Sequence, residues 1–358
     1  MRKTTNLRIL GVNPLLSPVA LQQDVPLTDV ATETVARARQ EVSAILSGQN
    51  DRLLVVVGPC SVHDPAAAID YAKRLKVVAD ELRDDLCVVM RVYFEKPRTT
   101  VGWKGLINDP QLDGTFRINE GLRVARSLLR DINDLGLPCG SEFLDPISPQ
   151  FISGLISWGA IGARTTESQT HRELASGLSM PIGFKNGTTG NVQIAIDAVL
   201  SSSHPHHFLG VTEEGMAGIV STAGNPDCHV ILRGSTSGPN YEDSHIEQAA
   251  AGLLKAGQRP CVMVDASHGN SSKDHKKQVL VANALAEQLA GGQRYLIGVM
   301  LESFLVEGNQ KLTDRSSLCY GQSITDACLS WEDTVPALQT LAKGVQQRRR
   351  SPAKRWQA

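Results

Sequence analysis

Residues 53–65 read LLVVVGPCSVHDP, an uncharged apolar run that ends in glycine, proline and cysteine before an aspartate–proline pair. Consecutive apolar residues of this kind are typical of a strand covered on both faces, as in a parallel sheet. Asp64 followed by Pro65 indicates a helix that begins with a side-chain cap and a proline in its first turn. The stretch predicts a strand, a short loop containing Cys60, and a helix.

The same alternation of short apolar runs and longer amphipathic stretches continues along the chain. Eight strand–helix units predict an α/β fold, a closed (β/α)8 TIM barrel. The alternative is a doubly wound open sheet, but its glycine-rich GxGxxG fingerprint is not matched by GPCSVHDP after the first strand. The predicted strands are Leu53–Val57, Leu86–Arg91, Leu137–Glu142, Gly159–Arg164, Met180–Lys185, His229–Arg233, Cys261–Asp265 and Leu296–Glu302. The first helix is predicted to begin at Asp64–Pro65, and the others to cover about Phe116–Leu135, Pro149–Trp158, Glu167–Gly177, Val192–Ser203, Glu242–Ala256, Lys273–Ala290 and Glu332–Gln347.

Segments outside these units predict the domain organisation. Residues 1–50 form an N-terminal extension, in which we expect an extended segment at Leu7–Val12 and a helix near Ala31–Leu46. Such extensions often cover a partner subunit or the base of the barrel, so we assign this one to oligomer formation or regulation. Within the catalytic barrel, residues 51–348, the glycine-punctuated stretch 208–222 is typical of an inserted β-hairpin before the sixth strand. Residues 349–358 are expected to form a solvated basic tail.

The composition argues against several classes of protein. The net charge is −1, whereas nucleic-acid binders usually carry a basic surplus. No uncharged apolar run approaches the ~18 residues of a membrane span, and the N-terminus does not resemble a signal peptide. Seven scattered cysteines without a CxxC pair are typical of reduced thiols. We therefore expect a cytoplasmic protein that binds neither nucleic acid nor membranes.

Charged side chains close nearly every predicted strand, and the carboxyl ends of barrel strands carry the active site. A salt bridge at the barrel rim would explain any one of the basic residues. Together they favour a bound anion, because two nearby carboxylates are too few to neutralise them. Phosphate and carboxylate fit best, since arginine binds both in a bidentate manner. The basic residues are Arg91, Lys96, Arg164, Lys185 and Arg233, and the carboxylates are Glu142 and Asp265.

A second set, Cys60, His268, Glu302 and Asp326, combines a thiol, an imidazole and two carboxyl groups. Each residue alone could be an ordinary buried, capping or surface group. The first and eighth strands become neighbours when a barrel closes, so these side chains can converge. The set suits a divalent metal ion, namely Mn²⁺, Fe²⁺, Co²⁺ or Zn²⁺.

Two loops could bind further anions. The loop after the second strand, Lys96-Pro97-Arg98-Thr99-Thr100, offers two cations and two hydroxyl groups to a second phosphate, although an exposed turn is the simpler explanation. The loop from Lys185 to Gly190 could present backbone N–H groups at a helix start, and a plain strand-to-helix turn is equally compatible.

Eight motifs, which extend over essentially the whole chain, closely resemble those of the type I, feedback-regulated 3-deoxy-D-arabino-heptulosonate 7-phosphate (DAHP) synthases. They are GPCSVHDP, MRVYFEKPRTTVGWKG, GSEFLDPISPQ, GARTTESQ, GFKNGT, GNPDCHVILRG, VDASHGNSSKD and YGQSITDACLSWEDT. The resemblance implies that Cys60, His268, Glu302 and Asp326 are the metal ligands. It also implies that phosphoenolpyruvate is bound by Arg91, Lys96, Glu142, Arg164, Lys185 and Arg233, and erythrose 4-phosphate by Lys96, Pro97, Arg98 and Thr99.

The implied reaction is a metal-dependent, aldol-like condensation that opens the pathway to the aromatic amino acids. C3 of phosphoenolpyruvate attacks the aldehyde of erythrose 4-phosphate, water adds at C2 and phosphate leaves. The metal acts as a Lewis acid on the aldehyde oxygen. Lys96 is the expected proton donor, with His268 or a metal-bound water as alternatives. Among the ligands we assign catalytic roles to His268 and Asp326.

Members of this family are usually inhibited by one aromatic amino acid and form dimers or tetramers. The inhibitor site resembles the region of Pro146, Gln150, Ser179, Phe208, Gly210 and Val220, completed by the N-terminal segment of a neighbouring subunit. Phenylalanine-sensitive members carry serine at the position of Gly210, and the smaller glycine leaves room for a phenolic hydroxyl. We therefore expect tyrosine as the effector, with tryptophan or phenylalanine as alternatives. Gly210 could also serve only the backbone of the hairpin.

Three other readings share some of these residues. A Schiff-base aldolase would use Lys185 as its nucleophile but would leave the metal set without a role. The related reaction on arabinose 5-phosphate uses the same barrel, but those chains lack the N-terminal extension and the KPRTT loop. A non-catalytic amino-acid sensor would need only the effector region, and the complete metal set argues against it.

Overall fold

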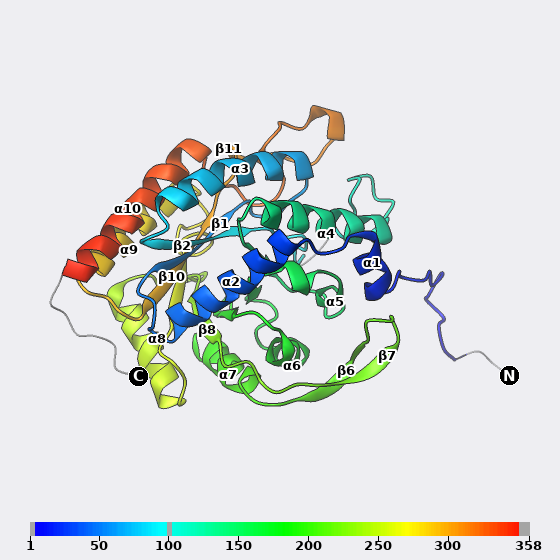
Figure 1. Ribbon diagram of the computed structural model, residues 1–358, viewed down its shortest axis with the longest axis horizontal. Coiled ribbons are helices and arrows are strands. Elements are labelled where there is room, and N and C mark those ends of the chain that lie inside the picture. Colours follow the sequence, from blue (N-terminus) through cyan, green and yellow to red (C-terminus); the bar gives the residue numbers. More distant parts are fainter. Residues whose placement is uncertain (1–3, 99–101, 351–358) are drawn as a thin grey trace.

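The structure is a computed structural model that describes residues 4–98 and 102–350. Eight parallel strands form a closed barrel in the order β1-β10-β9-β8-β5-β4-β3-β2, surrounded by helices (Figure 1). The TIM-barrel prediction is confirmed, and every barrel strand overlaps its predicted range. The strands are β1 (Leu53–Gly58), β2 (Leu86–Arg91), β3 (Cys139–Glu142), β4 (Trp158–Ile161), β5 (Ile182–Lys185), β8 (Cys228–Leu232), β9 (Val262–Asp265) and β10 (Leu296–Glu302).

The surrounding helices follow the predicted pattern with some shifted ends. The Asp64 side chain caps the first of them, accepting hydrogen bonds from the N–H groups of Ala66 and Ala67. The helix expected to end at Trp158 is only one turn long and continues as a 3-10 turn. The helix expected from Lys273 begins at Lys277. The helices are α3 (Pro65–Glu81), α4 (Ile118–Asp134), α5 (Pro149–Ile152) with η1 (Ser153–Leu155), α6 (Gln169–Gly177), α7 (Gln193–Ser202), α8 (Asp243–Lys255), α9 (Lys277–Ala290) and α10 (Trp331–Arg350).

Alternate residues of β1 pack into two different apolar clusters. Leu53, Val55 and Val57 belong to the large cluster that also contains the core residues of the outer helices. Leu54 and Val56 belong to a second cluster, which fills the barrel. This inner cluster includes Val42, Ile45 and Leu46 of helix α2 (Asp29–Leu46), so α2 covers the amino-terminal end of the barrel.

The N-terminal extension contains the predicted helix as α2 and one further helix. The segment Leu7–Val12, expected to be extended, contains no strand, and its Leu10 and Val12 side chains are exposed. A helix that we did not predict, α1 (Pro18–Asp24), precedes α2; the Ser17 side chain caps it and Pro18 occupies its first turn. The same cap-and-proline signature that marks α3 was present here in the sequence.

The C-terminal boundary also differs. Helix α10 continues to Arg350, past the expected end of the barrel at residue 348. Arg349 lies 2.8 Å from Asp51 and 2.6 Å from Asp85, which flank the amino ends of β1 and β2. The first residues of the expected tail therefore belong to the folded barrel, and the rest of the tail lies outside the described residues.

The inserted hairpin consists of β6 (His207–Val211) and β7 (Ala217–Ser221), which pair antiparallel next to the barrel. Its tip reaches α1, where Val19 N–H donates to the Glu213 carbonyl over 2.9 Å. Figure 1 shows the hairpin extending from α6 and α7 towards α1. Among the described helices, none combines the length and the apolar character needed to cross a membrane.

Candidate active site

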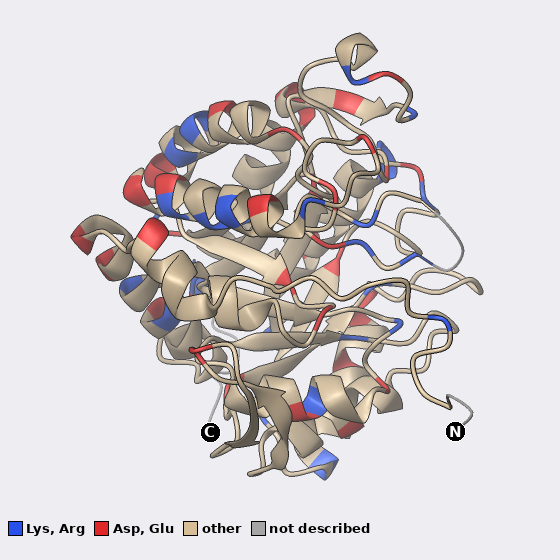
Figure 2. Cartoon of the chain, turned by 90° about the vertical axis from the view of Figure 1, so that its right-hand side faces the viewer, with Lys and Arg blue, Asp and Glu red and all other residues tan. Residues whose placement is uncertain are grey.

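The carboxyl ends of the barrel strands bring most of the predicted site residues together. Figure 2 shows acidic and basic residues on the connecting loops as well as on the helices. Among the predicted metal ligands, donor atoms of Cys60, Glu302 and Asp326 lie within 4.8 Å of one another. His268 lies beside this group, with its Nε2 atom 4.0 Å from Glu302 Oε1. Three carboxylate or thiol donors and one adjacent imidazole fit a divalent metal ion.

Asp326 reaches this group because the chain folds back after β10. The segment forms a small sheet from β11 (Val306–Asn309) and β12 (Gln322–Ser323). Leu329 N–H then donates to the Glu302 carbonyl over 2.8 Å, which anchors the returning chain beside β10. As a result, Asp326 Oδ2 lies 3.5 Å from Cys60 Sγ.

Lys96 contacts two of the predicted ligands. Its Nζ atom lies 2.9 Å from Cys60 Sγ and 3.9 Å from Asp326 Oδ2. Burial raises the pKa of the Cys60 thiol to about 11, and Glu302 adds to the shift while Lys96 opposes it. Burial alone would raise the pKa of Asp326, but Lys96 and His268 outweigh it and hold this pKa below its usual value. The ammonium group therefore favours the negatively charged forms of both donors.

Arg91 connects the barrel wall to the same group. Its Nη2 atom donates to Glu302 Oε1 and to the Cys60 carbonyl, each over 3.0 Å. Its guanidinium carbon lies 3.6 Å from the ring centroid of Tyr93, a cation–π contact. Arg91 is 1% exposed, so it holds two predicted metal ligands in place. Tyr93 was not among the predicted site residues, although it follows Arg91 by two positions and continues the inward face of β2.

A buried ion pair lies next to His268. Asp265 Oδ2 is 3.0 Å from Lys185 Nζ and 3.1 Å from His268 Nδ1. Burial would raise the pKa of Asp265, but Lys185 and His268 outweigh it and hold this pKa well below its usual range. When His268 Nδ1–H donates to Asp265, its Nε2 lone pair faces Glu302 and is available to a metal ion. Ser267 Oγ lies 2.6 Å from the same Nδ1 atom and donates to Asp265 Oδ1, so it is a second possible acceptor for the Nδ1 proton. The tautomer is thus set by two residues outside the predicted ligand set.

We expected the five cations to outnumber their protein partners, and this expectation was only partly right. Arg91, Lys185 and Lys96 are paired with Glu302, Asp265 and the Cys60–Asp326 group. Within the described residues, Arg164 and Arg233 form no salt bridge of 4 Å or less. Burial lowers the pKa of Arg233, and the positive charge of Arg164 acts in the same direction. These two arginines are therefore the groups most available to an incoming anion.

Glycines allow the site loops to approach closely. A Cβ atom on Gly162, just past β4, would lie 2.4 Å from Oε1 of the buried Glu142 at the end of β3. A Cβ atom on Gly269 would lie 2.3 Å from the backbone nitrogen of Ser235. Gly269 follows His268, and Ser235 follows Arg233 by two positions. The loops that carry the candidate ligand and the candidate anion binder are therefore in direct contact.

The predicted loop for the second phosphate is only partly described. Pro97 is half-buried, and Arg98 is exposed, with its Nε donating to the Trp103 carbonyl over 2.8 Å. Thr99 lies outside the described residues. The structure thus places Lys96 beside the candidate metal ligands Cys60 and Asp326, and Arg98 at the surface.

The predicted effector residues lie in two regions linked by α1. Phe208, Gly210 and Val220 lie on the half-buried face of the hairpin, whereas Leu209 and Ile219 on its other face are 88% and 80% exposed. Pro146 and Ser179 are exposed, and Gln150 is half-buried in α5. Helix α1 packs against α5 and is hydrogen-bonded to the hairpin tip.

Glu95 is a buried carboxyl group that the sequence patterns did not single out. It accepts a hydrogen bond from Ser148 Oγ over 2.9 Å, and burial raises its pKa to about 8. The folded protein then keeps a proton that the unfolded chain loses above its ordinary pKa of 4.5. The free energy of unfolding should therefore fall as the pH rises from about 4.5 to 8.

The Glu95→Gln variant should remove this dependence. We expect it to match the parent protein near pH 4.5 and to exceed its stability above pH 8 by about 5 kcal/mol, because the pKa rises from 4.5 to about 8 and each pKa unit corresponds to about 1.4 kcal/mol. Denaturant unfolding at several pH values measures the difference. The exposed Glu247→Gln variant is the control, and an equal pH slope in the parent and in Glu95→Gln would contradict this explanation.

Active sites of closed parallel barrels lie at the carboxyl ends of their strands. In the described part of the chain, the buried ion pairs, the candidate metal ligands and the two arginines without a salt bridge gather at that end. The molecule is therefore a (β/α)8-barrel enzyme. Its sequence matches the family described as DAHP synthetase I over residues 28–339. The chain belongs to this family.

The similarity to known proteins covers nearly the whole chain. It is 59% identical over 344 residues to the Phe-sensitive phospho-2-dehydro-3-deoxyheptonate aldolase of Escherichia coli (strain K12), which covers 96% of this chain and 98% of that protein. It is 54% identical over 348 residues to the tyrosine-inhibited enzyme of Schizosaccharomyces pombe, covering 96% and 94%. The solved structure of the Francisella tularensis SCHU S4 aldolase superposes with a TM-score of 0.93 at 54% identity, covering 95% and 99%.

Proposed function

We propose that this protein is a metal-dependent 3-deoxy-7-phosphoheptulonate synthase, which condenses phosphoenolpyruvate with D-erythrose 4-phosphate to give DAHP and phosphate. The observation that carries the proposal is the group of Cys60, Glu302 and Asp326 within 4.8 Å, with His268 and Lys96 beside it. A divalent metal held by Cys60, His268, Glu302 and Asp326 would supply a Lewis acid for the aldehyde oxygen. The seven free cysteines support a cytoplasmic enzyme.

The cations at the barrel mouth would bind and orient the two anionic substrates. Arg164 and Arg233, which have no salt-bridge partner among residues 4–98 and 102–350, would bind the phosphate or carboxylate of phosphoenolpyruvate. Lys185 and Glu142, which end β5 and β3, would complete that subsite. Pro97, Arg98 and Thr99 would receive the phosphate of the aldose. Fixed positive groups here also favour the charge that develops during the reaction.

Lys96 is the proposed proton donor to the hydroxyl formed from the aldehyde. Burial alone would lower its pKa, but the charges of Cys60, Glu302 and Asp326 outweigh it and raise this pKa. Lys96 would thus carry a proton at neutral pH, in contact with the ligands that would hold the metal. His268 is the alternative donor, although its Nδ1 is already engaged with Asp265 and its Nε2 would face the metal.

The test is phosphate release from phosphoenolpyruvate and erythrose 4-phosphate, measured with Mn²⁺ and with EDTA. We expect turnover that EDTA abolishes and that added Mn²⁺ restores. Turnover unaffected by EDTA, or activity with arabinose 5-phosphate alone, would contradict the proposal. Borohydride trapping with substrate addresses the Schiff-base alternative, which the Lys185–Asp265 ion pair disfavours because such a lysine must react as a neutral amine.

Tyrosine is the proposed feedback effector, bound near Pro146, Gln150, Ser179, Phe208, Gly210 and Val220. Among the similar proteins, the S. pombe enzyme is tyrosine-inhibited and the E. coli enzyme is Phe-sensitive. A Cβ atom at Gly210 would lie 2.6 Å from Val220 Cγ2, so a serine at this position would have to displace Val220, another residue of the proposed effector site. The glycine present here avoids that displacement, which supports tyrosine as the effector. The exposed Leu209 and Ile219, together with the exposed N-terminal Leu10, support a homo-oligomer, a dimer or a tetramer, that covers this surface.

The Gly210→Ser variant should exchange the effector. The new side chain displaces Val220 and shrinks the space for a phenolic hydroxyl, so inhibition by tyrosine should weaken ~10-fold and inhibition by phenylalanine should strengthen. Phosphate release at increasing concentrations of each amino acid measures both. Gly218→Ser, at the paired position of the hairpin, is the control. An unchanged order of inhibitors in Gly210→Ser would remove Gly210 from the effector site.

A further inference from the structure

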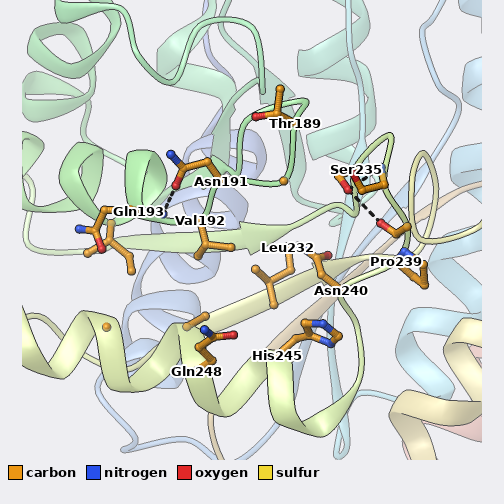
Figure 3. A pocket seen from close by; sticks show the side chains of 16 residues that line it. Thr189, Asn191, Val192, Gln193, Leu232, Ser235, Pro239, Asn240, His245 and Gln248 are labelled. Atoms are coloured by element: carbon orange, nitrogen blue, oxygen red, sulfur yellow. Dashed lines mark hydrogen bonds between the residues drawn. The ribbon is translucent and has the colours of Figure 1, made fainter.

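A cavity of about 610 Å³ lies between α7 and α8, beside the barrel mouth. Figure 3 shows its polar rim, with Asn191 and Gln193 at the start of α7, Ser235 and Asn240 on the loop after β8, and His245 and Gln248 on α8. Leu232, Ile196 and Ala249 are buried and form its apolar floor. The volume is within the range of pockets that bind small molecules.

The lining of this cavity selects against charged ligands. Its 16 residues include no Lys, Arg, Asp or Glu. They do include polar groups without a protein partner in the described part of the chain. His245 Nδ1 is buried and forms no hydrogen bond with these residues. Asn191 Oδ1 accepts a hydrogen bond from the Gln193 N–H, whereas the side-chain NH2 group of Asn191 has no partner there. Amide side chains pair well with the edge of a nucleobase, and hydroxyl groups such as that of Ser237 suit a sugar.

A hydrogen-bond network connects the cavity wall to the loops of the active site. Asn240 Oδ1 accepts from Gly234 N–H over 2.7 Å, and Asn240 Nδ2 donates to Asn186 Oδ1 over 3.3 Å. Asn186 Oδ1 in turn accepts from Arg233 N–H over 2.8 Å. Gly234 and Asn186 are the direct neighbours of Arg233 and Lys185. A ligand that moves Asn240 would therefore move the backbone of both basic residues.

We propose that this cavity is a second ligand site, for an uncharged molecule of nucleoside size with an apolar face and a hydrogen-bonding edge, and that Asn240 and Asn186 couple its occupancy to Arg233 and Lys185. The coupling rests on the proposed role of these two residues in binding phosphoenolpyruvate. Binding in the cavity itself does not depend on that role.

Binding is tested with the full chain by saturation-transfer NMR and calorimetry, using adenosine and N-acetyl-L-phenylalaninamide as uncharged probes. We expect at least one of them to bind saturably, and adenosine 5′-monophosphate to bind more weakly than adenosine because no cation lines the cavity. Gln248→Trp should block the cavity and abolish binding. His245→Phe, which replaces the imidazole by a slightly larger ring without nitrogen atoms, should weaken binding ~3-fold.

Ala251→Trp, at an exposed position of α8 outside the cavity, is the matched control and should bind like the parent protein. Circular dichroism shows whether each variant is folded. Failure of both uncharged probes to bind the parent, or equal binding to Gln248→Trp, would overturn the site.

Coupling is tested by measuring the affinity for phosphoenolpyruvate with and without a saturating probe. We expect a change of at least ~5-fold in the parent protein and none in Asn240→Ser, which breaks the network but keeps the cavity. Probe binding with unchanged phosphoenolpyruvate affinity would overturn the coupling. If phosphoenolpyruvate itself does not bind, the proposed function fails, while the probe measurements on the cavity remain valid.

Discussion

The Cys60→Ala variant should lose about 10³-fold in turnover and should no longer retain a divalent metal ion. Cys60 supplies the thiol of the candidate metal group, and its Sγ atom also contacts Lys96, the proposed proton donor. One substitution thus removes a ligand and the partner that positions the donor. Phosphate release and metal content after dialysis measure the two effects separately.

Cys328→Ala is the matched control for this substitution. Cys328 is buried next to Cys60, whose N–H donates to its Sγ atom over 3.4 Å, but it is not a predicted ligand. It should keep its metal and most of its turnover. A Cys60→Ala protein that retains one metal ion per chain and at least a tenth of its activity would remove Cys60 from the metal site.

The Asp265→Asn variant should lose roughly 3–5 kcal/mol of unfolding free energy, because it leaves the buried Lys185 ammonium without its partner. It should also bind the metal more weakly, because His268 Nδ1 loses an acceptor that orients the ring. Loss of a residue that hydrogen-bonds to a metal ligand typically weakens metal binding about 10–100-fold. Denaturant unfolding measures the first effect and metal titration the second.

Two comparisons make this prediction specific. Asp227→Asn breaks the more exposed ion pair with Arg259 and should cost less than ~1 kcal/mol. The double variant Lys185→Met, Asp265→Leu removes both buried charges and should recover most of the stability without recovering activity. If Asp265→Asn were as stable as Asp227→Asn, the ion pair with Lys185 would not contribute as we infer.

The barrel could be predicted because each strand is a short apolar run that ends at a polar residue. Leu53–Val57 and Leu86–Arg91 needed no tertiary information, since burial on both faces requires apolar residues at every position. The short helix α1 could also have been found, from Ser17 and Pro18. The segment Leu7–Val12 forms no strand, because an apolar segment without a pairing strand has no partner for its backbone groups.

The candidate site was predictable as a set of residues but not as a set of contacts. Strand position alone brought Cys60 and Glu302 together. The approach of Asp326 depends on the return of the chain through Leu329, which no local pattern indicates. The pairing of Lys185 with Asp265 was equally hidden, because sequence spacing does not tell which charges neutralise one another across a barrel. Glu95 was missed because its burial and its hydrogen bond with Ser148, 53 positions later, both depend on the tertiary fold.

The closure of β1 against β10 has a consequence for synthesis in the cell. While the ribosome translates the stretch from Leu53 to Leu296, which takes on the order of 10–50 s, one edge of β1 stays without the strand that it pairs with in the finished ring. The last helical turn, which holds Arg349 against Asp51 and Asp85, emerges later still. An unpaired apolar edge invites association with other nascent chains. We therefore expect the nascent chain to depend on a chaperone, and chains truncated before residue 296 to aggregate.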